Sequence, residues 1–209
     1  MNKQAQALLD TAPGTYAEQA GIKLADKPSP LYQLLVLTVL LSHRIQADIA
    51  VAAARELFRA GFTTPRRMLD ATWQQRVDAL GRGHFVRYDE STATRLGEGA
   101  QLVLDRWSGD LRRLRKEADG DVRKLKRLLR EVPGIGPSGA DIFCRETQAV
   151  WPELRPYLDR RAIDGARKLN LPTDADQLAK LVPGDRLAAF SADLVRVTLD
   201  RDLAKQLTR

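Results

Sequence analysis

Residues 128–141 read LLREVPGIGPSGAD, and this stretch decides the fold that the sequence predicts. A basic amphipathic helix ends before Pro133, and Pro137 suits the first position of a second helix. Gly134 and Gly136 lie between the two helices, where glycine permits a positive φ and the close approach of another backbone. The unpaired amide groups at the start of the second helix predict an anion site suited to a nucleic-acid phosphate. Taken alone, the motif also fits a plain corner between two helices.

The rest of the sequence has a helical pattern. Apolar residues recur at spacings of three and four, glycine and proline separate the segments, and no stretch alternates with a period of two. We therefore expect an all-α protein of about nine or ten helices joined by short connections. The expected helical segments are 34–41, 49–58, 73–80, 96–107, 122–129, 140–150, 162–169, 175–181 and 187–199. The aromatic residues expected in the core are Phe85, Trp73, Trp107 and Trp151.

The composition is that of a soluble globular protein with a basic surface. Of the 209 residues, 29% are charged and 44% are hydrophobic, and the formal net charge is +7. A positive charge of this size favours a polyanionic partner, because binding neutralises phosphates and releases counterions. Ten Arg or Lys residues stand against six Asp or Glu residues between Asp105 and Glu131, so positive charge is concentrated just before the hairpin.

The cysteine and histidine content excludes several kinds of site. Cys144 is the single cysteine, so neither an intramolecular disulfide nor a cysteine-ligated iron–sulfur cluster can form within the chain. The two histidines, His43 and His84, are not enough to form a metal site. The longest apolar stretch, 34–41, is far shorter than the roughly 18–20 residues that span a bilayer. With no secretory signal in sight, we expect a cytoplasmic protein without a membrane partner, associated with the nucleoid if its source is bacterial.

With its surroundings, the hairpin resembles that of the helix-hairpin-helix (HhH-GPD) DNA glycosylases of the endonuclease III superfamily. Residues 34–42, LLVLTVLLS, resemble the apolar helix that opens the six-helix barrel domain of that family. Residues 158–169 resemble the segment that carries the family's catalytic aspartate, and Asp159 follows Ser138 by 21 residues. The resemblance covers roughly residues 28–200.

The resemblance implies an all-α fold of two domains. A six-helix barrel would occupy residues 30–142, with the helix-hairpin-helix motif at about 122–142. A second helical domain would come from both termini, residues 1–29 and 143–209, and would carry the candidate catalytic aspartate. The family's iron–sulfur cluster needs four cysteines that the residues after Leu199 do not supply, so we expect no cluster. The one expected bound ion is a monovalent cation on the backbone carbonyls of Arg130, Val132 and Ile135.

Asp159 is the candidate catalytic residue. Cleavage of an N-glycosidic bond passes through an oxocarbenium-like sugar, which a nearby carboxylate stabilises. The competing interpretation is that Asp159 caps the following helix and does nothing else. By the family pattern, Asp141 and Asp164 lie on helices and are structural.

Ser138 departs from the family pattern in an informative way. Members that also cleave the DNA strand carry a lysine at this position, whose amine forms a Schiff base with the sugar. A serine hydroxyl cannot form that imine, and the largely monofunctional adenine-glycosylase branch also has a serine here. We therefore expect hydrolytic base removal with little or no lyase activity. Thr38 stands where the adenine branch has a glutamate, so adenine excision is not implied.

The resemblance also implies contacts with DNA and with an extruded base. A long polar side chain in the turn 42–46 would fill the gap left by the base, and Arg44 best matches that position. An exposed turn of ordinary polar residues is the alternative. Thr38 and Tyr88 are assigned to the base pocket. The predicted DNA-binding residues are Gly134, Gly136, Ser138, Gly139, Arg130, Arg44, His43 and Gln46.

The predicted function is a monomeric DNA N-glycosylase of base excision repair that removes a damaged or mispaired base from double-stranded DNA by hydrolysis. Three alternatives stay open: a non-catalytic DNA-structure-binding protein that retains the glycosylase fold, a residual lyase that uses another amine, and a helical protein-interaction domain. Oxidised pyrimidines, mispaired or deaminated bases and alkylated purines all stay open as substrates, because contacts with a base come from scattered side chains.

Overall fold

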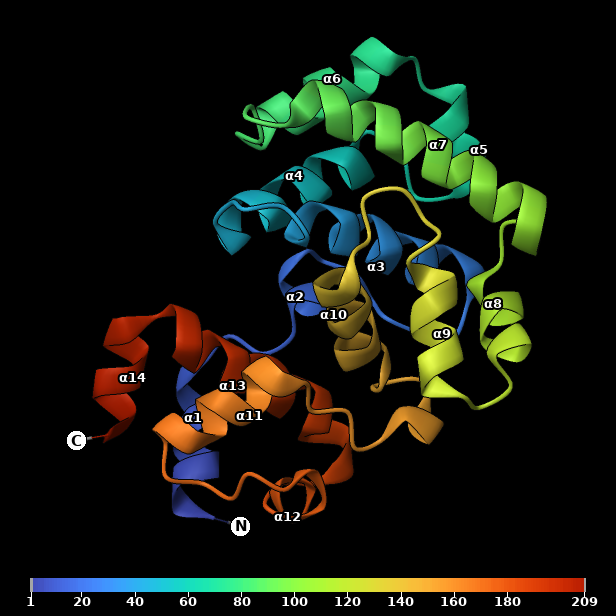
Figure 1. The fold of residues 1–209 in the computed structure, drawn as a ribbon. Coiled ribbons are helices and arrows are strands. Elements are labelled where there is room, and N and C mark those ends of the chain that lie inside the picture. Colours follow the sequence, from blue (N-terminus) through green and yellow to red (C-terminus); the bar gives the residue numbers. More distant parts are fainter. Residues whose placement is uncertain (1, 209) are drawn as a thin grey trace. The chain divides into compact units, whose positions relative to one another are not determined.

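The computed structural model describes residues 2–208 and shows helices joined by turns, without a strand among these residues (Figure 1). The described chain forms fourteen α-helices and two short 3-10 helices. The all-α prediction is therefore confirmed. Several additional helices are short, such as α2 (Tyr16–Gln19) and α12 (Ala175–Ala179), and one turn of helix is too short to produce a periodic pattern. None of the described helices is both long enough and apolar enough to cross a membrane.

The chain divides into two compact units. Unit 1 consists of Met1–Gln19 and Cys144–Arg209, and unit 2 consists of Ala20–Phe143. Unit 2 begins earlier than the predicted barrel domain, because residues 20–29 pack within it. There Asp26 forms an ion pair with Arg115 at 2.8 Å.

Unit 2 is built around one buried helix. The helices of this unit are α3 (Pro28–Leu41), α4 (Ala47–Arg59), α5 (Pro65–Asp70), α6 (Trp73–Arg82), α7 (Asp89–Trp107), α8 (Leu111–Ala118), α9 (Val122–Leu129) and the start of α10 (Pro137–Thr147). Every residue from Leu34 to Leu40 is buried, and α3 contacts α4, α7 and α8. Apolar side chains cover all sides of α3, as expected for a helix enclosed by others.

A buried arginine ties three helices of unit 2 together. Arg76 on α6 donates hydrogen bonds to the backbone carbonyls of Met68 and Ala71, each at 2.9 Å, and to that of Ala93 on α7 at 2.9 Å. The Met68 and Ala71 carbonyls lie at the C-terminal end of α5, where the helix has no further amide groups to donate hydrogen bonds to them. Burial lowers the pKa of the Arg76 guanidinium from its ordinary value.

Three of the four aromatic residues assigned to the core are buried. Phe85 and Trp151 are fully buried, and Trp107 is 1% exposed. The prediction for Trp73 is wrong, because its side chain is 41% exposed and its indole Nε1 donates to Thr94 Oγ1 at 3.1 Å. Trp73 is the first residue of α6 and lies outside the face of that helix that is buried.

Unit 1 is organised by the crossing of two helices. Its elements are α1 (Lys3–Thr11), α2, the end of α10, η1 (Pro152–Leu154), α11 (Arg160–Lys168), α12, η2 (Gly184–Arg186), α13 (Leu187–Leu199) and α14 (Arg201–Thr208). At Gly165 on α11, an added Cβ would lie 1.8 Å from the backbone oxygen of Leu194 on α13. The two backbones meet so closely that only glycine fits at this position. This crossing fixes α11, and Asp159 stands at the N-terminus of that helix.

A buried charged cluster holds the N-terminal segment within unit 1. Arg196 on α13 pairs with Asp193 at 2.5 Å, and its guanidinium lies 4.1 Å from the centre of the Tyr16 ring. Asp193 also accepts a hydrogen bond from the Gly14 amide at 3.2 Å. Glu146 accepts one from the Ala17 amide at 2.9 Å. These contacts connect residues 14–17 to α10 and α13.

The two buried acids of this cluster prefer a proton more than exposed carboxyls do. Burial raises the pKa of Asp193 from 3.8 to about 6, against the opposing effect of Arg196. Burial likewise raises the pKa of Glu146. One oxygen of each carboxylate, Asp193 Oδ2 and Glu146 Oε1, has no hydrogen-bond partner in the described chain. Desolvation thus outweighs the favourable partners at both sites.

The Asp193 carboxyl makes the stability of the protein dependent on pH. Between its ordinary pKa of 3.8 and its folded pKa of about 6, the folded state keeps a proton that the unfolded state has lost. The free energy of unfolding therefore falls as the pH rises through this window. We expect Asp193→Asn to flatten this fall, measured by urea unfolding at several pH values. Asp164→Asn, which changes an exposed carboxyl on α11, should keep it. The same slope in wild type and Asp193→Asn would contradict the assignment.

Candidate functional site

The hairpin has the predicted helix–turn–helix geometry. Helix α9 ends at Leu129, and the turn is tightened by hydrogen bonds from the Val132 amide to the Leu129 oxygen at 3.1 Å and from the Ile135 amide to the Val132 oxygen at 3.0 Å. Val132 and Ile135 are buried, so the turn is anchored by apolar side chains in unit 2. Helix α10 begins at Pro137, as the sequence predicts.

The glycines of the hairpin differ in backbone conformation and in how closely their neighbours pack. Gly134 has a φ of +93°, and an added Cβ would lie 3.0 Å from Val39 Cγ1. Gly136 lacks a positive φ, and nothing lies within 4 Å of an added Cβ, so neither its backbone conformation nor a close contact requires glycine there. Gly139, one of the predicted DNA-binding residues, also packs closely against Ser42. An added Cβ at this position would lie 2.4 Å from Ser42 Oγ. Two glycines therefore place the hairpin against α3 and the turn that follows it.

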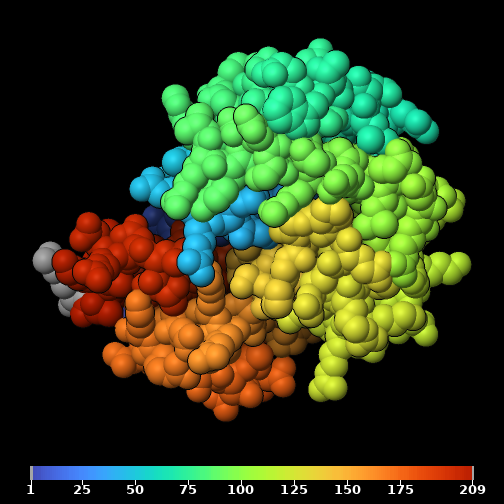
Figure 2. Space-filling model, turned by 45° about the horizontal axis from the view of Figure 1, so that its top comes forward, coloured from blue at the N-terminus to red at the C-terminus, as the bar shows by residue number. Residues whose placement is uncertain are grey.

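The first turn of α10 offers unpaired hydrogen-bond donors. The first amide of α10 that donates a hydrogen bond is that of Ala140, whose acceptor is the Gly136 oxygen. The amides of Ser138 and Gly139 come before it and donate no hydrogen bond within residues 2–208. Ser138 is exposed. With the helix dipole, such amides attract an anion. The hairpin lies in yellow on the face of unit 2 that Figure 2 shows.

The predicted cation ligands are backbone carbonyls of the same turn. The Val132 oxygen accepts the Ile135 amide, and a carbonyl oxygen keeps a second lone pair for an ion. The side chain of Arg130 is exposed, while those of Val132 and Ile135 are buried. The cation site stays a prediction.

The turn after α3 meets the loop after α6 through stacked rings. The imidazole of His43 stacks on Tyr88, with ring centres 4.9 Å apart, and meets Phe85 edge-on at 5.4 Å. His43 Nε2 shares a hydrogen bond with Thr92 Oγ1 at 3.1 Å. Burial and the nearby Arg95 lower the pKa of His43, so the ring is neutral at neutral pH. No sequence spacing signals this contact between residues 45 positions apart.

The other residues assigned to base and DNA contacts lie in different environments. Arg44 and Gln46 are exposed in the turn after α3, where Gln46 takes the N-cap position of α4. Tyr88 is half-buried. Thr38 is fully buried, and its hydroxyl donates to the Leu34 carbonyl at 2.8 Å. The structure therefore brings His43 and Tyr88 together and leaves Thr38 buried within α3.

Asp159 is a buried carboxylate with a partner on each oxygen. Its Oδ1 accepts the Ala162 amide at 2.9 Å, which makes Asp159 the N-cap of α11. Its Oδ2 forms an ion pair with Nη1 of Arg145 on α10, and the side chains of Arg145 and Asp159 are 3% and 5% exposed. The prediction that Asp159 caps the following helix is therefore confirmed. The sequence does not predict the role of Arg145, because the residues around an arginine on a helix do not show which carboxylate it pairs with in the fold.

A glutamine fixes the loop that leads to Asp159. Gln148 Nε2 donates to the Tyr157 oxygen at 2.9 Å, and its Oε1 accepts the Tyr157 amide at 3.0 Å. Arg155 donates to the backbone oxygens of Gln148 at 2.6 Å and Ala149 at 2.7 Å. The loop 152–158 is thus held by side chains at both ends, and the position of Asp159 is set before any ligand binds.

The remaining candidate carboxylates have structural partners. Asp141 pairs with Lys126 at 2.5 Å, and Asp164 pairs with Arg167 at 2.6 Å on the exposed side of α11. Ser138 belongs to unit 2 and Asp159 to unit 1, so the two predicted catalytic positions come from different units.

Comparison with known proteins identifies the fold. No model of a protein family matches the chain, and no curated protein does either. Solved structures that match include a trapped endonuclease III–DNA covalent intermediate (estranged-adenine complex), with a TM-score of 0.50, and a non-covalent endonuclease III–DNA complex, with a TM-score of 0.52. Each is 14% identical and covers 94% of this chain and 86% of the other. This chain has the endonuclease III fold. The predicted all-α, helix-hairpin-helix fold class is thereby confirmed.

Within the endonuclease III fold, the turn at Gly134 should be sensitive to substitution and the one at Gly136 should not. Alanine at 134 must adopt a positive φ beside Val39, which costs about 1–3 kcal/mol. Alanine at 136 meets open space and should change the free energy of unfolding by no more than about 0.5 kcal/mol. Urea unfolding of Gly134→Ala and Gly136→Ala measures both values. Equal losses in the two variants would show that the strain at Gly134 is not the cause.

Proposed function

We propose that this protein is a DNA N-glycosylase of base excision repair that hydrolyses the bond between a damaged or mispaired base and its sugar in double-stranded DNA. The observation that carries the proposal is the preset carboxylate of Asp159 in a chain with the endonuclease III fold. The two similar structures are complexes with DNA. The unpaired amides of the hairpin supply the donors that a phosphate needs.

Asp159 supplies a fixed negative charge for the reaction. A carboxylate has about four acceptor positions, and the Ala162 amide and Arg145 engage one on each oxygen. The other positions can accept from water or face a sugar that becomes positive in the transition state. Arg145 acts as a positioning residue, because its ion pair with Asp159 holds the orientation of the carboxylate.

Ser138 supports a hydrolytic reaction. Its hydroxyl stands at the start of α10 and cannot form a Schiff base with the sugar, so the proposal is a monofunctional enzyme. The chain has one cysteine, Cys144, which is buried, so its residues cannot supply the four thiolates of an iron–sulfur cluster. We include in the proposal a monomeric, cytoplasmic protein with a monovalent cation at the hairpin.

Base contacts are assigned to the stacked pair His43 and Tyr88. An aromatic ring that is half-exposed can stack on an extruded base. We do not extend this role to Thr38, because its side chain is buried and its hydroxyl is bound to Leu34. Arg44 and Gln46 are exposed beside His43 and are assigned to the gap that the base leaves.

A non-catalytic DNA-structure-binding protein is the second candidate. The observation that favours it is the enclosure of Asp159, which is 5% exposed and paired with Arg145. Tight, salt-sensitive binding to kinked or abasic DNA without base release from any lesion would support this candidate.

Asp159→Asn should abolish base release while the variant still binds DNA. Loss of the charge that stabilises the transition state lowers the single-turnover rate on the order of 100-fold or more. The measurement is a screen of lesion-bearing duplexes for strand breaks that require alkali. Asp164→Asn changes a carboxyl on the same helix and should retain the wild-type rate. Undiminished release by Asp159→Asn would exclude this residue as the catalytic group.

Arg145 should affect the rate of base release through Asp159. Arg145→Gln removes the ion pair and lets the carboxylate move, which lowers the single-turnover rate about 10–100-fold at saturating enzyme. Arg145→Lys keeps the positive charge and should restore part of the loss. A double variant, Arg145→Gln with Asp159→Asn, should be no slower than Asp159→Asn alone. Additive losses, or equal rates for the glutamine and lysine variants, would show that Arg145 does not act by positioning Asp159.

A further inference from the structure

Nearly all the net charge of the protein resides in twenty residues. Residues 111–130 contain nine Arg or Lys and three Asp or Glu, a net charge of +6, out of +7 for the whole chain. The other residues together carry a net charge of only +1. This segment comprises α8 and α9, which pack on each other within unit 2. The basic character of the protein is therefore a property of one surface.

About a third of these positive side chains are neutralised by local partners. Lys126 pairs with Asp141 at 2.5 Å, Arg115 with Asp26 at 2.8 Å, and Arg112 with Asp110 at 2.7 Å. Within residues 2–208, the basic side chains of this segment without a carboxylate partner are Arg113, Lys116, Arg123, Lys124, Arg127 and Arg130.

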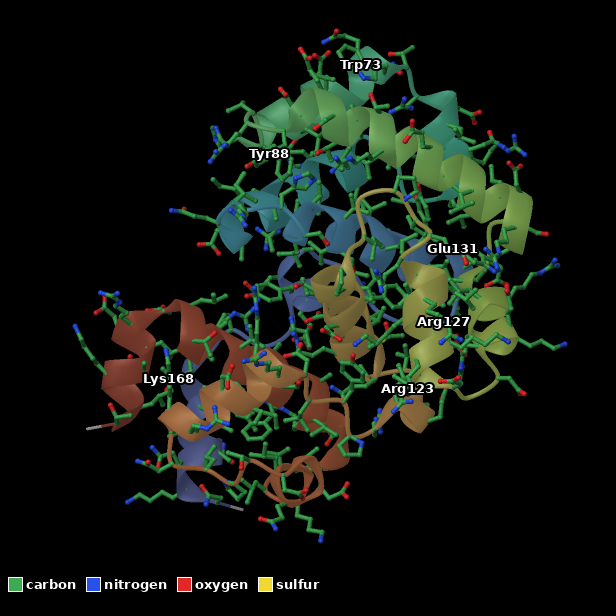
Figure 3. The ribbon with its side chains drawn as sticks, in the orientation of Figure 1. Trp73, Tyr88, Arg123, Arg127, Glu131 and Lys168 are labelled. Carbon is green, nitrogen blue, oxygen red and sulfur yellow. The ribbon has the colours of Figure 1, made fainter. Side chains whose placement is uncertain are left out.

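Three of the unpaired arginines form a straight stripe on α9. Arg123, Arg127 and Arg130 follow one another by four and three residues, the spacing of one helix face, and all three are exposed. Figure 3 labels Arg123 and Arg127 on this helix. The opposite face buries Leu125 and Leu128. From the first arginine to the last the helix rises about 10 Å, which is about three nucleotide steps along one DNA strand.

The stripe continues into the hairpin. Arg130 is the C-cap of α9 and opens the turn that leads to the free amides of α10. In Figure 1 the chain passes directly from the C-terminal end of α9 into the hairpin loop that leads to α10. One row of positive charge therefore leads away from the proposed phosphate site.

The character of this surface favours a nucleic acid over a protein partner. Protein interfaces contain an apolar centre inside a polar rim. The large hydrophobic side chains that are exposed in the described chain are Trp73, Val86 and Leu199, and none of them lies on α8 or α9. Exposed, evenly spaced arginines without apolar neighbours suit a backbone of regularly spaced phosphates.

We propose that the α9 stripe binds the sugar–phosphate backbone of duplex DNA beyond the phosphate held at the hairpin. This inference rests on DNA as the partner in the proposed function and defines how far the DNA-binding surface of unit 2 extends. The contacts are to phosphates, so they add affinity and fix the path of the duplex without reading its sequence.

Two double variants of equal net charge test the stripe. Arg123→Gln with Arg127→Gln removes two charges from α9, and Arg66→Gln with Arg67→Gln removes two exposed charges from α5. The dissociation constant for an undamaged duplex is measured over a series of salt concentrations. We expect the slope of log Kd against log salt to fall by about 1.8 for the α9 pair, at about 0.9 per phosphate contact, and to stay at the wild-type value for the α5 pair.

The outcomes separate this inference from the proposed function. Because the duplex is undamaged, the result does not depend on base release. Equal slopes for the two double variants, or an α9 slope equal to that of wild type, overturn the stripe while the glycosylase proposal stands. Failure of the wild-type protein to bind any duplex overturns both. Urea unfolding of both double variants shows whether the loss is one of contact or of folding.

Discussion

The left-handed turn at Gly134 is the constraint on which the arrangement of unit 2 depends. Its φ of +93° reverses the chain between α9 and α10, and its lack of a side chain lets the turn approach Val39 on α3. Gly139 meets Ser42 in the same way. Since α3 is the buried centre of the unit, the hairpin packs against the core of unit 2. The free amides of α10 therefore stand at a defined place beside the turn 42–46.

Unit 1 depends on buried polar pairs. Asp159 is held by Arg145 and by the α11 amide, and Gln148 holds the loop before it. A buried ion pair adds little net stability, because desolvation offsets the attraction, but loss of one partner is costly. Such a pair fixes position more than it stabilises the fold. The same physics applies to Asp193 and Arg196, where the partly satisfied carboxyl has a raised pKa.

The division of labour in the proposed enzyme follows from these features. In the proposed function, the hairpin and the α9 stripe would contact phosphates, which are the same at every position of a duplex. Discrimination of a damaged base must then come from groups that touch the base, and the stacked rings of His43 and Tyr88 are suited to that task. The lowered pKa of His43 favours the uncharged ring, which stacks on Tyr88 and shares a hydrogen bond with Thr92.

The sequence by itself determined the all-α class, the hairpin with its basic helix, and Asp159 at a helix N-terminus, because each is a local pattern of spacing, capping or charge. Only the tertiary structure decided that Gly134 needs to be glycine, that Gly139 packs closely against Ser42, that Gly136 meets open space, and that Trp73 is exposed. It also supplied the partners: Arg145 for Asp159, Tyr88 for His43 and three carbonyls for Arg76. Partners distant in sequence leave no periodic trace, since the contact exists only after the helices pack.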